Sequence, residues 1–372
     1  MKKILFVANV AKEHLNKFHL PTIRALRRRG WQVDCASNGD ELVPECDHDL
    51  KMSWKRSPFT AGTFKGLSEL KKVLKNEHYD LIYCHTPVGG LEARLAAKNA
   101  RKEGTKVVYC AHGLHFYEGA PKKNWLVFYP VEKALAGKTD VLFTVNREDY
   151  KLACEKFGKK GCRIELVPEV GINTKRLQVE DPEGARKEVR ERYGIPADAF
   201  LCVYIAELID NKNQGMLLKM LKQLVDDGRK AHLMLVGPDH ADGKFQAEAE
   251  ALGIADHVTF TGWQSDIGPL LYASDVCVAS SIREGFGINL AEAMYCGLPV
   301  VATDNRGHRM IIEDGVNGFL VPVNDAEAMA KRVAELMDNP DVYAKYAHQD
   351  AAKFDAEVIA EELADRLEEV CR

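Results

Sequence analysis

The sequence predicts an α/β protein made of two doubly wound, Rossmann-like domains that face each other across a cleft. A length of 372 residues is too great for one ordinary domain and suits two. Apolar strands alternate with amphipathic helices in both halves of the chain, which indicates parallel sheets covered by helices. A polar, highly charged stretch after residue 172 separates the two series.

The first series predicts a domain over residues 1–172. Its strands are near-continuous runs of apolar residues, as expected of parallel strands that are buried on both faces. We expect strands at KILFVANV, WQVDCAS, DLIYCHT, KVVYCAHG and VLFTVN, and helices at LPTIRALRRRG, FKGLSELKKVLKNEHY and LEARLAAKNARKEG.

The second series predicts a domain over residues 173–345, entered through RIELVPEVGIN, which is interpreted as a linker. A helical segment over 346–372 is expected to pack back on the N-terminal domain. The expected strands are FLCVYIAEL, HLMLVG, HVTFTG, VCVAS, PVVATD and GFLVP, with helices at GMLLKMLKQLVDDG, KFQAEAEALG, AEAMAKRVAELM and FDAEVIAEELADRLEEVCR.

The bulk composition is that of a globular protein with its own cores, at 46% hydrophobic and 28% charged residues. The ten cysteines include no C-x-x-C pair, which favours reduced thiols in a cytosolic compartment. The apolar stretch near the N-terminus is only eight residues long and lacks a clean cleavage site, so it is interpreted as a strand. Because no run approaches the ~20 apolar residues of a membrane span, no crossing is expected.

Charge is distributed unevenly along the chain. Residues 1–172 hold 30 Lys and Arg against 20 Asp and Glu, whereas residues 173–372 hold 21 against 35. A basic first half suggests an anionic partner, such as anionic lipid, nucleic acid or a phosphorylated acceptor. A solvated surface of drifting composition explains it equally well, and no recognised nucleic-acid motif is present.

The stretch REGFGINLAEAM, residues 283–294, follows a predicted strand and opens a predicted helix near Gly287 or Ile288. The unpaired N–H groups and positive dipole of such a helix start can bind an anion such as a diphosphate. Glu292, inside the helix, could simply serve the helix dipole. Glu284, in the loop, would repel a phosphate and needs another partner, for which sugar hydroxyls are suitable.

Two carboxylates around an anion-binding helix start match a nucleotide sugar, in which a ribose and a hexose flank a diphosphate. A dinucleotide-binding fingerprint is the rival interpretation of G-F-G-I-N-L. It fails because Leu290 occupies the third small position, and because the first strand of the chain is followed by no glycine pair.

The block E-G-F-G-I-N-L-A-E resembles the E-x7-E motif of retaining glycosyltransferases of the GT-B fold, family 4. G-L-P-V-V-A-T-D, D-G-V-N-G-F-L-V-P, IAELIDNKNQ and HGLHF resemble further elements of that family. HTPVGG together with HGLHFYEGAPKKNWLVFYPVEKALA resembles its bacterial capsule and exopolysaccharide transferases. The resemblance spans nearly the whole chain and implies an acceptor-binding N-terminal domain and a nucleotide-sugar-binding C-terminal domain.

The resemblance implies three catalytic residues, Glu284, His112 and Lys212. Glu284 would bind hydroxyls of the donor hexose, His112 would meet that hexose from the other domain, and Lys212 would neutralise the departing diphosphate. Glu292 would bind the ribose. The implied donor-binding residues are Phe286, Gly287, Ile288, Asn289, Glu292 and Glu207.

Glu207 departs from the family pattern, which has an arginine there as a second diphosphate cation. Arg283 or Arg309 is a candidate replacement. Asn173, where an aspartate is common, is a second departure and is interpreted as structural.

The resemblance also implies transfer with retained anomeric configuration, without a metal or a cofactor. We expect a hexose or N-acetylhexosamine to pass from a UDP-sugar to a glycan acceptor linked to polyprenyl diphosphate, in surface polysaccharide synthesis. A sugar-nucleotide epimerase of the same fold and a non-catalytic nucleotide-sugar sensor remain alternatives, and Glu207 keeps the sensor open.

The aromatic and lysine residues of HFYEGAPKKNWLVFYPVEKALAGK, with RALRRRG, could place the protein peripherally on the cytoplasmic leaflet. An ordinary buried helix face is the alternative. The aromatic residues concerned are Phe116, Tyr117, Trp125, Phe128 and Tyr129.

Overall fold

The computed structural model of the chain describes residues 1–55 and 61–372, which form two compact units. The N-terminal unit contains residues 1–171 and 356–372, and the C-terminal unit contains residues 172–355. The chain therefore enters the second unit one residue earlier than the predicted boundary. The last segment returns to the N-terminal unit at Ala356, later than the position 346 expected for it.

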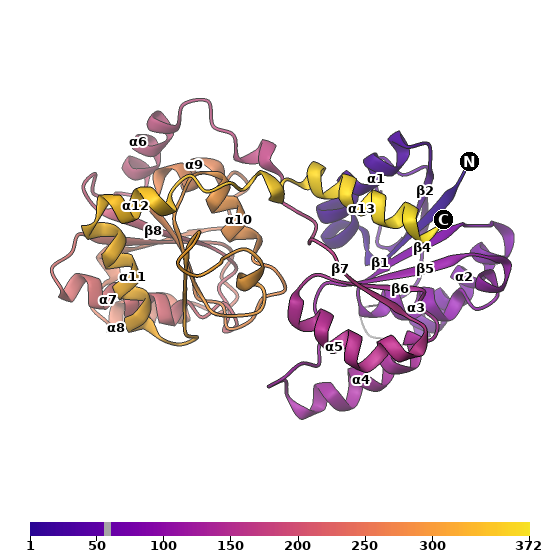
Figure 1. Cartoon of the computed structure of the whole chain (residues 1–372). Coiled ribbons are helices and arrows are strands. Elements are labelled where there is room, and N and C mark those ends of the chain that lie inside the picture. The colour runs from indigo at the N-terminus through magenta and orange to yellow at the C-terminus, as the bar shows by residue number, and fades with distance from the viewer. Residues whose placement is uncertain (56–60) are drawn as a thin grey trace. The chain divides into compact units, whose positions relative to one another are not determined.

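The N-terminal unit is a seven-stranded parallel sheet in the order β3-β2-β1-β4-β5-β6-β7, with helices on both faces (Figure 1). Its strands are β1 Lys3–Val10, β2 Gln32–Asn38, β3 His48–Lys51, β4 Leu81–His85, β5 Lys106–Ala111, β6 Val141–Thr144 and β7 Arg163–Leu166. Its helices are the π-helix η1 Ala11–His19, α1 Leu20–Arg28, α2 Ala61–Asn76, α3 Pro87–Ala96, η2 Ala100–Glu103, α4 Lys122–Ala136, α5 Arg147–Phe157, η3 Gly158–Lys160 and α13 Ala356–Val370.

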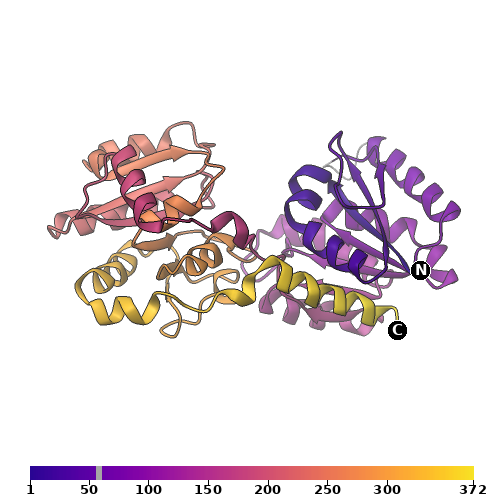
Figure 2. The same ribbon diagram turned by 90° about the horizontal axis from the view of Figure 1, so that it is seen from above.

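The last helix, α13, completes the N-terminal unit by covering α1, and the two run side by side in both views (Figures 1 and 2). Its side chains Ile359, Leu363 and Leu367 are 2% exposed or less and join the core formed with β1. Around this apolar contact, Arg29 bonds to Glu361 at 2.6 Å. The apolar spacing i, i+4, i+8 places these side chains on one face of the helix.

The C-terminal unit is a six-stranded parallel sheet in the order β10-β9-β8-β11-β12-β13. Its strands are β8 Phe200–Ile205, β9 Ala231–Val236, β10 Val258–Gly262, β11 Val276–Ala279, β12 Val300–Thr303 and β13 Phe319–Val321. Its helices are η4 Thr174–Leu177, α6 Pro182–Arg192, α7 Gln214–Asp226, α8 Lys244–Ala251, η5 Ala255–His257, α9 Gly268–Ala273, α10 Ile288–Tyr295, η6 His308–Met310, α11 Ala326–Asp338, α12 Pro340–Tyr346 and η7 Ala352–Phe354.

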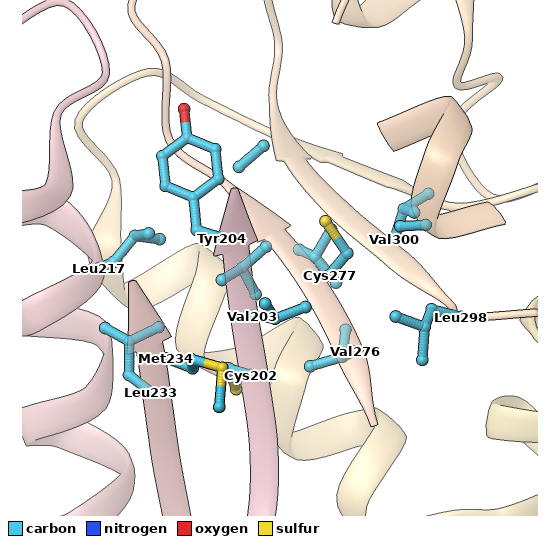
Figure 3. Close-up of a cluster of buried hydrophobic side chains, with 14 of the residues drawn as sticks. Cys202, Val203, Tyr204, Leu217, Leu233, Met234, Val276, Cys277, Leu298 and Val300 are labelled. Carbon is cyan, nitrogen blue, oxygen red and sulfur yellow. The ribbon is translucent and has the colours of Figure 1, made fainter. Parts of the chain in front are cut away.

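The apolar centre of the second sheet is built from β8, β9, β11 and β12. Figure 3 shows side chains of these strands, such as Val203, Met234 and Val276, gathered with Leu217 of α7. Tyr204 lies at one end of this cluster, with its hydroxyl pointing away from the cluster's centre (Figure 3).

Both sheets reverse strand order once, between β1 and β4 and between β8 and β11. In open α/β sheets, ligands bind outside the carboxyl ends of the strands at such a switch point. The loops that follow β1 and β4 in one unit, and β8 and β11 in the other, are therefore the first places to look for a site.

Candidate active site

The loops after β8 and β11 bring Lys212 and Glu284 into direct contact. Lys212 Nζ lies 2.5 Å from Glu284 Oε1, and the two side chains are 21% and 17% exposed. The hydroxyl of Ser281 donates to the same carboxylate oxygen at 2.6 Å. A half-buried ion pair at the carboxyl edge of the sheet is the central feature of this site.

A hydrogen-bonded relay links the pair to the sheet. Because Ser281 gives its only proton to Glu284, the Tyr204 hydroxyl must donate to Ser281 Oγ, at 2.7 Å. Burial and the charge of Glu284 raise the pKa of Tyr204, so this hydroxyl keeps its proton. Tyr204 and Ser281 thereby orient the Glu284 carboxylate.

The loops that carry the two charged residues are also joined through their backbones. The Ser280 hydroxyl donates to the carbonyl of Lys212 at 2.7 Å, and the amide of Ile282 donates to the carbonyl of Asn211 at 2.8 Å. Asn211 Nδ2 in turn donates to the carbonyl of Arg283 at 3.0 Å. The Lys212–Glu284 contact therefore rests on a braced pair of loops.

The loop after β12 supports the other side of Glu284. The hydroxyl of Thr303 donates to the carbonyl of Ser281 at 2.6 Å, and Arg306 Nε donates to the carbonyl of Glu284 at 3.3 Å. A β-carbon on Gly307 would lie 2.6 Å from the β-carbon of Glu284, which is closer than real contacts allow. The sequence motifs assign no role to Thr303, Arg306 or Gly307. Strand β12 lies next to β11, so the loop that follows β12 begins at the same edge of the sheet.

Helix α10 begins at Ile288 beside Glu284, as the sequence predicts. Its N-cap residue, Gly287, has φ of 110°, a backbone conformation that favours glycine. Asn289, in the first turn, has a buried Nδ2 without a hydrogen-bond partner among the residues that the structure describes. An unsatisfied buried amide at a helix start is a candidate ligand donor.

Two further residues predicted to bind the nucleotide-sugar donor are buried. Phe286 is 6% exposed, and its ring centre lies 5.9 Å from that of Phe354. Glu292 is 7% exposed and interacts with the buried Cys277 and Cys296. Burial raises the pKa of both thiols, and the charge of Glu292 raises it further. Glu292 is thus more enclosed than a carboxylate that only serves a helix dipole on the surface.

Glu207, where the family resemblance leads us to expect an arginine, is exposed after β8. Its carboxylate lies 4.0 Å from His240 Nε2, and its carbonyl accepts a hydrogen bond from Gln214 at 2.9 Å. Of the two candidate replacements, Arg309 bonds to Asp304 at 2.5 Å. Arg306, only 5% exposed and bonded to the Glu284 backbone, is the arginine that the structure places beside the pair.

His112 belongs to the N-terminal unit, where it directly follows β5. Its Nδ1 lies 2.7 Å from Glu169 Oε1. Burial acts to lower the pKa of His112, but the neighbouring Glu169 carboxylate dominates and the pKa is raised well above its usual range. The remaining predicted site residues all belong to the C-terminal unit.

One D-x-D triplet, at residues 47–49, has the spacing of a divalent-metal motif. It lies around the start of edge strand β3, and both carboxylates are engaged within the N-terminal unit. Asp47 accepts from Arg27 at 2.9 Å and from the amide of Val33 at 2.7 Å, and Asp49 accepts from the amide of Val43 at 2.9 Å. These contacts make the triplet a structural part of the sheet edge.

Two Rossmann-like units, with a Lys–Glu pair and a helix start at one strand edge, agree with the GT-B architecture that the sequence predicts. Residues 185–353 match the model of the glycosyl transferases group 1 family, and residues 3–146 match that of the glycosyl transferase 4-like family. The chain is 43% identical to the putative glycosyltransferase EpsD of Bacillus subtilis over 98% of this chain and 96% of that protein. The chain therefore belongs to this glycosyltransferase family, as the sequence motifs predicted.

Other relatives extend this comparison. The UDP-Gal:alpha-D-GlcNAc-diphosphoundecaprenol alpha-1,3-galactosyltransferase of Escherichia coli is 25% identical over 74% of this chain and 70% of that protein. The crystal structure of Anabaena HepE with UDP and glucose superimposes with a TM-score of 0.79 at 22% identity, covering 99% and 100% of the two chains. WaaG, involved in lipopolysaccharide biosynthesis, gives 0.73 at 20% identity, covering 99% of each chain. These two structures share the fold with this chain, which confirms the predicted fold class.

Proposed function

We propose that this glycosyltransferase moves a hexose or N-acetylhexosamine from a UDP-sugar to a glycan acceptor linked to polyprenyl diphosphate, in surface polysaccharide synthesis. The observation that carries the proposal is the Lys212–Glu284 pair beside the start of α10. The UDP donor and the lipid-linked acceptor are further supported by the names of the relatives from Anabaena and Escherichia coli.

The pair explains how one edge of a sheet can bind a sugar and a diphosphate together. The helix start of α10 attracts the diphosphate, and Lys212 can turn from Glu284 to a phosphate oxygen. Glu284 then accepts charge-assisted hydrogen bonds from hexose hydroxyls. Asn289 and Glu292, in the same helix, provide a donor and an acceptor for the rest of the nucleotide sugar.

The proposed chemistry is retaining transfer without a metal or cofactor. The acceptor oxygen bonds to the anomeric carbon on the face from which the diphosphate leaves, through an oxocarbenium-like transition state, and the hydroxyl proton passes to the departing diphosphate. Lys212 and the helix start stabilise the negative charge that develops on the departing diphosphate. His112, held by Glu169, is assigned to the donor hexose on the family resemblance.

The acceptor proposal places the protein peripherally at the cytoplasmic face of the membrane. No helix within residues 1–55 and 61–372 is long and apolar enough to cross a bilayer. The predicted aromatic surface is partly wrong, because Phe116 is fully buried and Trp125, Phe128 and Tyr129 pack against the core. Instead α4 exposes an apolar stripe at Leu126, Val127, Pro130, Val131 and Ala134, with Lys122, Lys123 and Lys133 nearby.

That stripe fits a membrane interface, since its members recur at three- and four-residue spacing beside basic residues. Leu126→Glu should reduce co-sedimentation with anionic vesicles at low salt, whereas Val316→Glu, an exposed control in the C-terminal unit, should not. Equal binding by the two variants, or no binding by the wild type, would reject the membrane proposal.

The donor is tested with a panel of UDP- and GDP-sugars, read out by thermal stabilisation and by product analysis with and without acceptor. A UDP-sugar should stabilise the protein, and stabilisation by GDP-mannose alone would reject the UDP assignment. Transfer with retained configuration supports the proposal. Epimerised donor in the absence of acceptor would make the protein an epimerase, and binding without turnover would make it a sensor.

The residue assignment is tested by Glu284→Ala, which should abolish transfer without unfolding the protein. Near-normal turnover would refute the role of Glu284. Lys212→Ala should also slow transfer, because it removes the cation assigned to the departing diphosphate. Its matched control is Lys187→Ala, which should leave transfer unchanged, because Lys187 pairs with Glu191 at 3.9 Å on the surface, with side chains 79% and 69% exposed.

A further inference from the structure

Four histidines meet at the strand-order reversal of the N-terminal sheet. His14 and His19 come from η1, which follows β1 directly; His85 ends β4; and His112 follows β5. Strands β1, β4 and β5 are neighbours and parallel, so these residues share one edge of the sheet. The four histidines come from three separate segments of the sequence, so no local motif predicts this cluster.

The spacing of the four imidazoles suits tetrahedral coordination. One ring nitrogen from each histidine lies within 4.8 Å of the other three. His14 and His19 approach at 3.2 Å between Nε2 atoms, and His85 Nδ1 lies 3.2 Å from His112 Nε2. Zinc–nitrogen bonds of about 2.0–2.1 Å in a tetrahedron place neighbouring nitrogens about 3.4 Å apart, so two edges are nearly preformed.

The ring positions agree with this geometry. The six distances between ring centroids run from 4.0 Å for His19 and His85 to 5.7 Å for His19 and His112. A tetrahedral tetra-imidazole site would place them about 5 Å apart. Small ring rotations, rather than movement of the backbone, would complete such a site.

Hydrogen bonding around the cluster provides a second, independent observation. His19 and His85 are fully buried and turn Nε2 and Nδ1, respectively, towards the cluster. The nitrogens that lack hydrogen-bond partners among the residues that the structure describes, His19 Nδ1 and His85 Nε2, are on the opposite edge of each ring. His112 instead bonds through Nδ1 to Glu169, the carboxylate–histidine arrangement that orients a metal ligand and leaves Nε2 for the metal.

We propose that His14, His19, His85 and His112 form a site for one divalent transition metal of the zinc type, oriented by Glu169. Neutral imidazoles in tetrahedral array favour zinc, with cobalt as its spectroscopic substitute. His14 and His19 both turn Nε2 towards the cluster, where the two atoms lie 3.2 Å apart. His112 contributes Nε2 while its Nδ1 keeps the contact with Glu169.

A consequence for activity rests on the proposed function. A metal held by His112 removes that imidazole from the donor hexose, so occupancy should inhibit transfer. Metal binding does not depend on the donor or on the reaction, so metal binding and inhibition of transfer are measured separately.

The test is metal binding by the chelator-treated protein. Binding of Zn²⁺ is measured by calorimetry, and binding of Co²⁺ is measured by visible absorption. We expect one ion per chain, an intense tetrahedral cobalt spectrum and no thiolate charge-transfer band. His14→Asn should weaken binding at least tenfold, and Glu169→Gln should weaken it about 10–100-fold. The surface control His240→Asn, with a side chain 58% exposed, should bind as the wild type does.

Circular dichroism and thermal melts establish that each variant is folded, and a partly exposed residue such as His14 is the least disruptive to replace. Absence of stoichiometric binding, an octahedral cobalt spectrum, or unchanged affinity in folded His14→Asn would overturn the proposal. Tight binding without inhibition of transfer would preserve the metal site and reject only the role of His112 in the reaction.

Discussion

Glu284→Gln separates the two tasks that the Lys212–Glu284 contact combines. The substitution keeps the size of the side chain and an oxygen for the Ser281 hydroxyl, but it removes the negative charge that lies 2.5 Å from Lys212 Nζ. Lys212 is then no longer shared between a carboxylate and a diphosphate. Binding of a nucleoside diphosphate without a sugar should therefore become tighter.

The magnitude follows from the environment of the pair. Unit charges at 4 Å interact by about 4 kcal/mol at an effective dielectric constant of 20 and by about 1 kcal/mol in water. Because these side chains are 21% and 17% exposed, we expect a gain of about 1–2 kcal/mol, or roughly 5–30-fold in affinity for UDP. Loss of a charge-assisted hydrogen bond to the hexose should offset this gain for the UDP-sugar by about 1.5–3 kcal/mol.

Isothermal titration with UDP and with the UDP-sugar measures both effects, with Glu191→Gln on the surface as the control. The expected signature is tighter UDP binding, reduced preference for the sugar nucleotide, and slower transfer. Weaker UDP binding together with an unchanged preference for the sugar would refute the assignment of Lys212 to the diphosphate and Glu284 to the hexose.

Three further perturbations test the surroundings of the site and the packing of α13. Gly307→Ala should displace the Glu284 loop, since its β-carbon would lie 2.6 Å from that of Glu284; transfer should fall at least tenfold while the fold is retained, as measured by kinetics and circular dichroism. Burial lowers the pKa of His308 to about 4, so the protein should lose about 2 kcal/mol of stability between pH 7 and pH 5, and His308→Gln should flatten this part of the denaturation profile. Leu363→Ala in α13 should cost the N-terminal unit about 2–5 kcal/mol by chemical denaturation, whereas Glu362→Ala on the same helix should cost less than about 0.5 kcal/mol.

The sign of the pH effect follows from the neutral state of the buried imidazole. Its folded pKa lies below the usual 6.5, so the unfolded chain binds the proton first as the pH falls. Stability is therefore full above pH 6.5 and decreases towards pH 4. A His308→Gln profile as steep as that of the wild type would assign the loss to other groups, such as His232, whose pKa burial also lowers to about 4.

The sequence predicted the central strands because burial on both faces requires continuous apolar runs. It missed β3 and β7, which are the two edge strands of the first sheet, with the sequences HDLK and RIEL. An edge strand pairs on one side only and tolerates charged residues. RIEL was consequently interpreted as linker, although it adds the seventh strand.

The start of α10 was predictable because a glycine turn between a strand and an apolar helix has a local signature. The Lys212–Glu284 contact was not, since it joins loops 72 positions apart and depends on the adjacency of β8 and β11. Arg306 was missed for the same reason. It reaches Glu284 from the loop after β12, which neighbours β11 in the sheet but not in the motif. Long-range pairings of this kind follow from topology, which periodicity alone does not determine.

The Lys212–Glu284 contact also suggests how donor and product are distinguished. Under the proposed assignment, Glu284 exchanges its bond to Lys212 for sugar hydroxyls only when a hexose is present, so the intact donor supplies a new partner to each residue. After transfer, the diphosphate remains without a sugar, and Glu284 again competes for Lys212. If position 207 contacts the diphosphate, as the family resemblance implies, Glu207 supplies no second cation, and we expect this competition to favour release of the product. An arginine at position 207 should therefore slow product release, because the diphosphate would keep a cation that Glu284 does not reclaim.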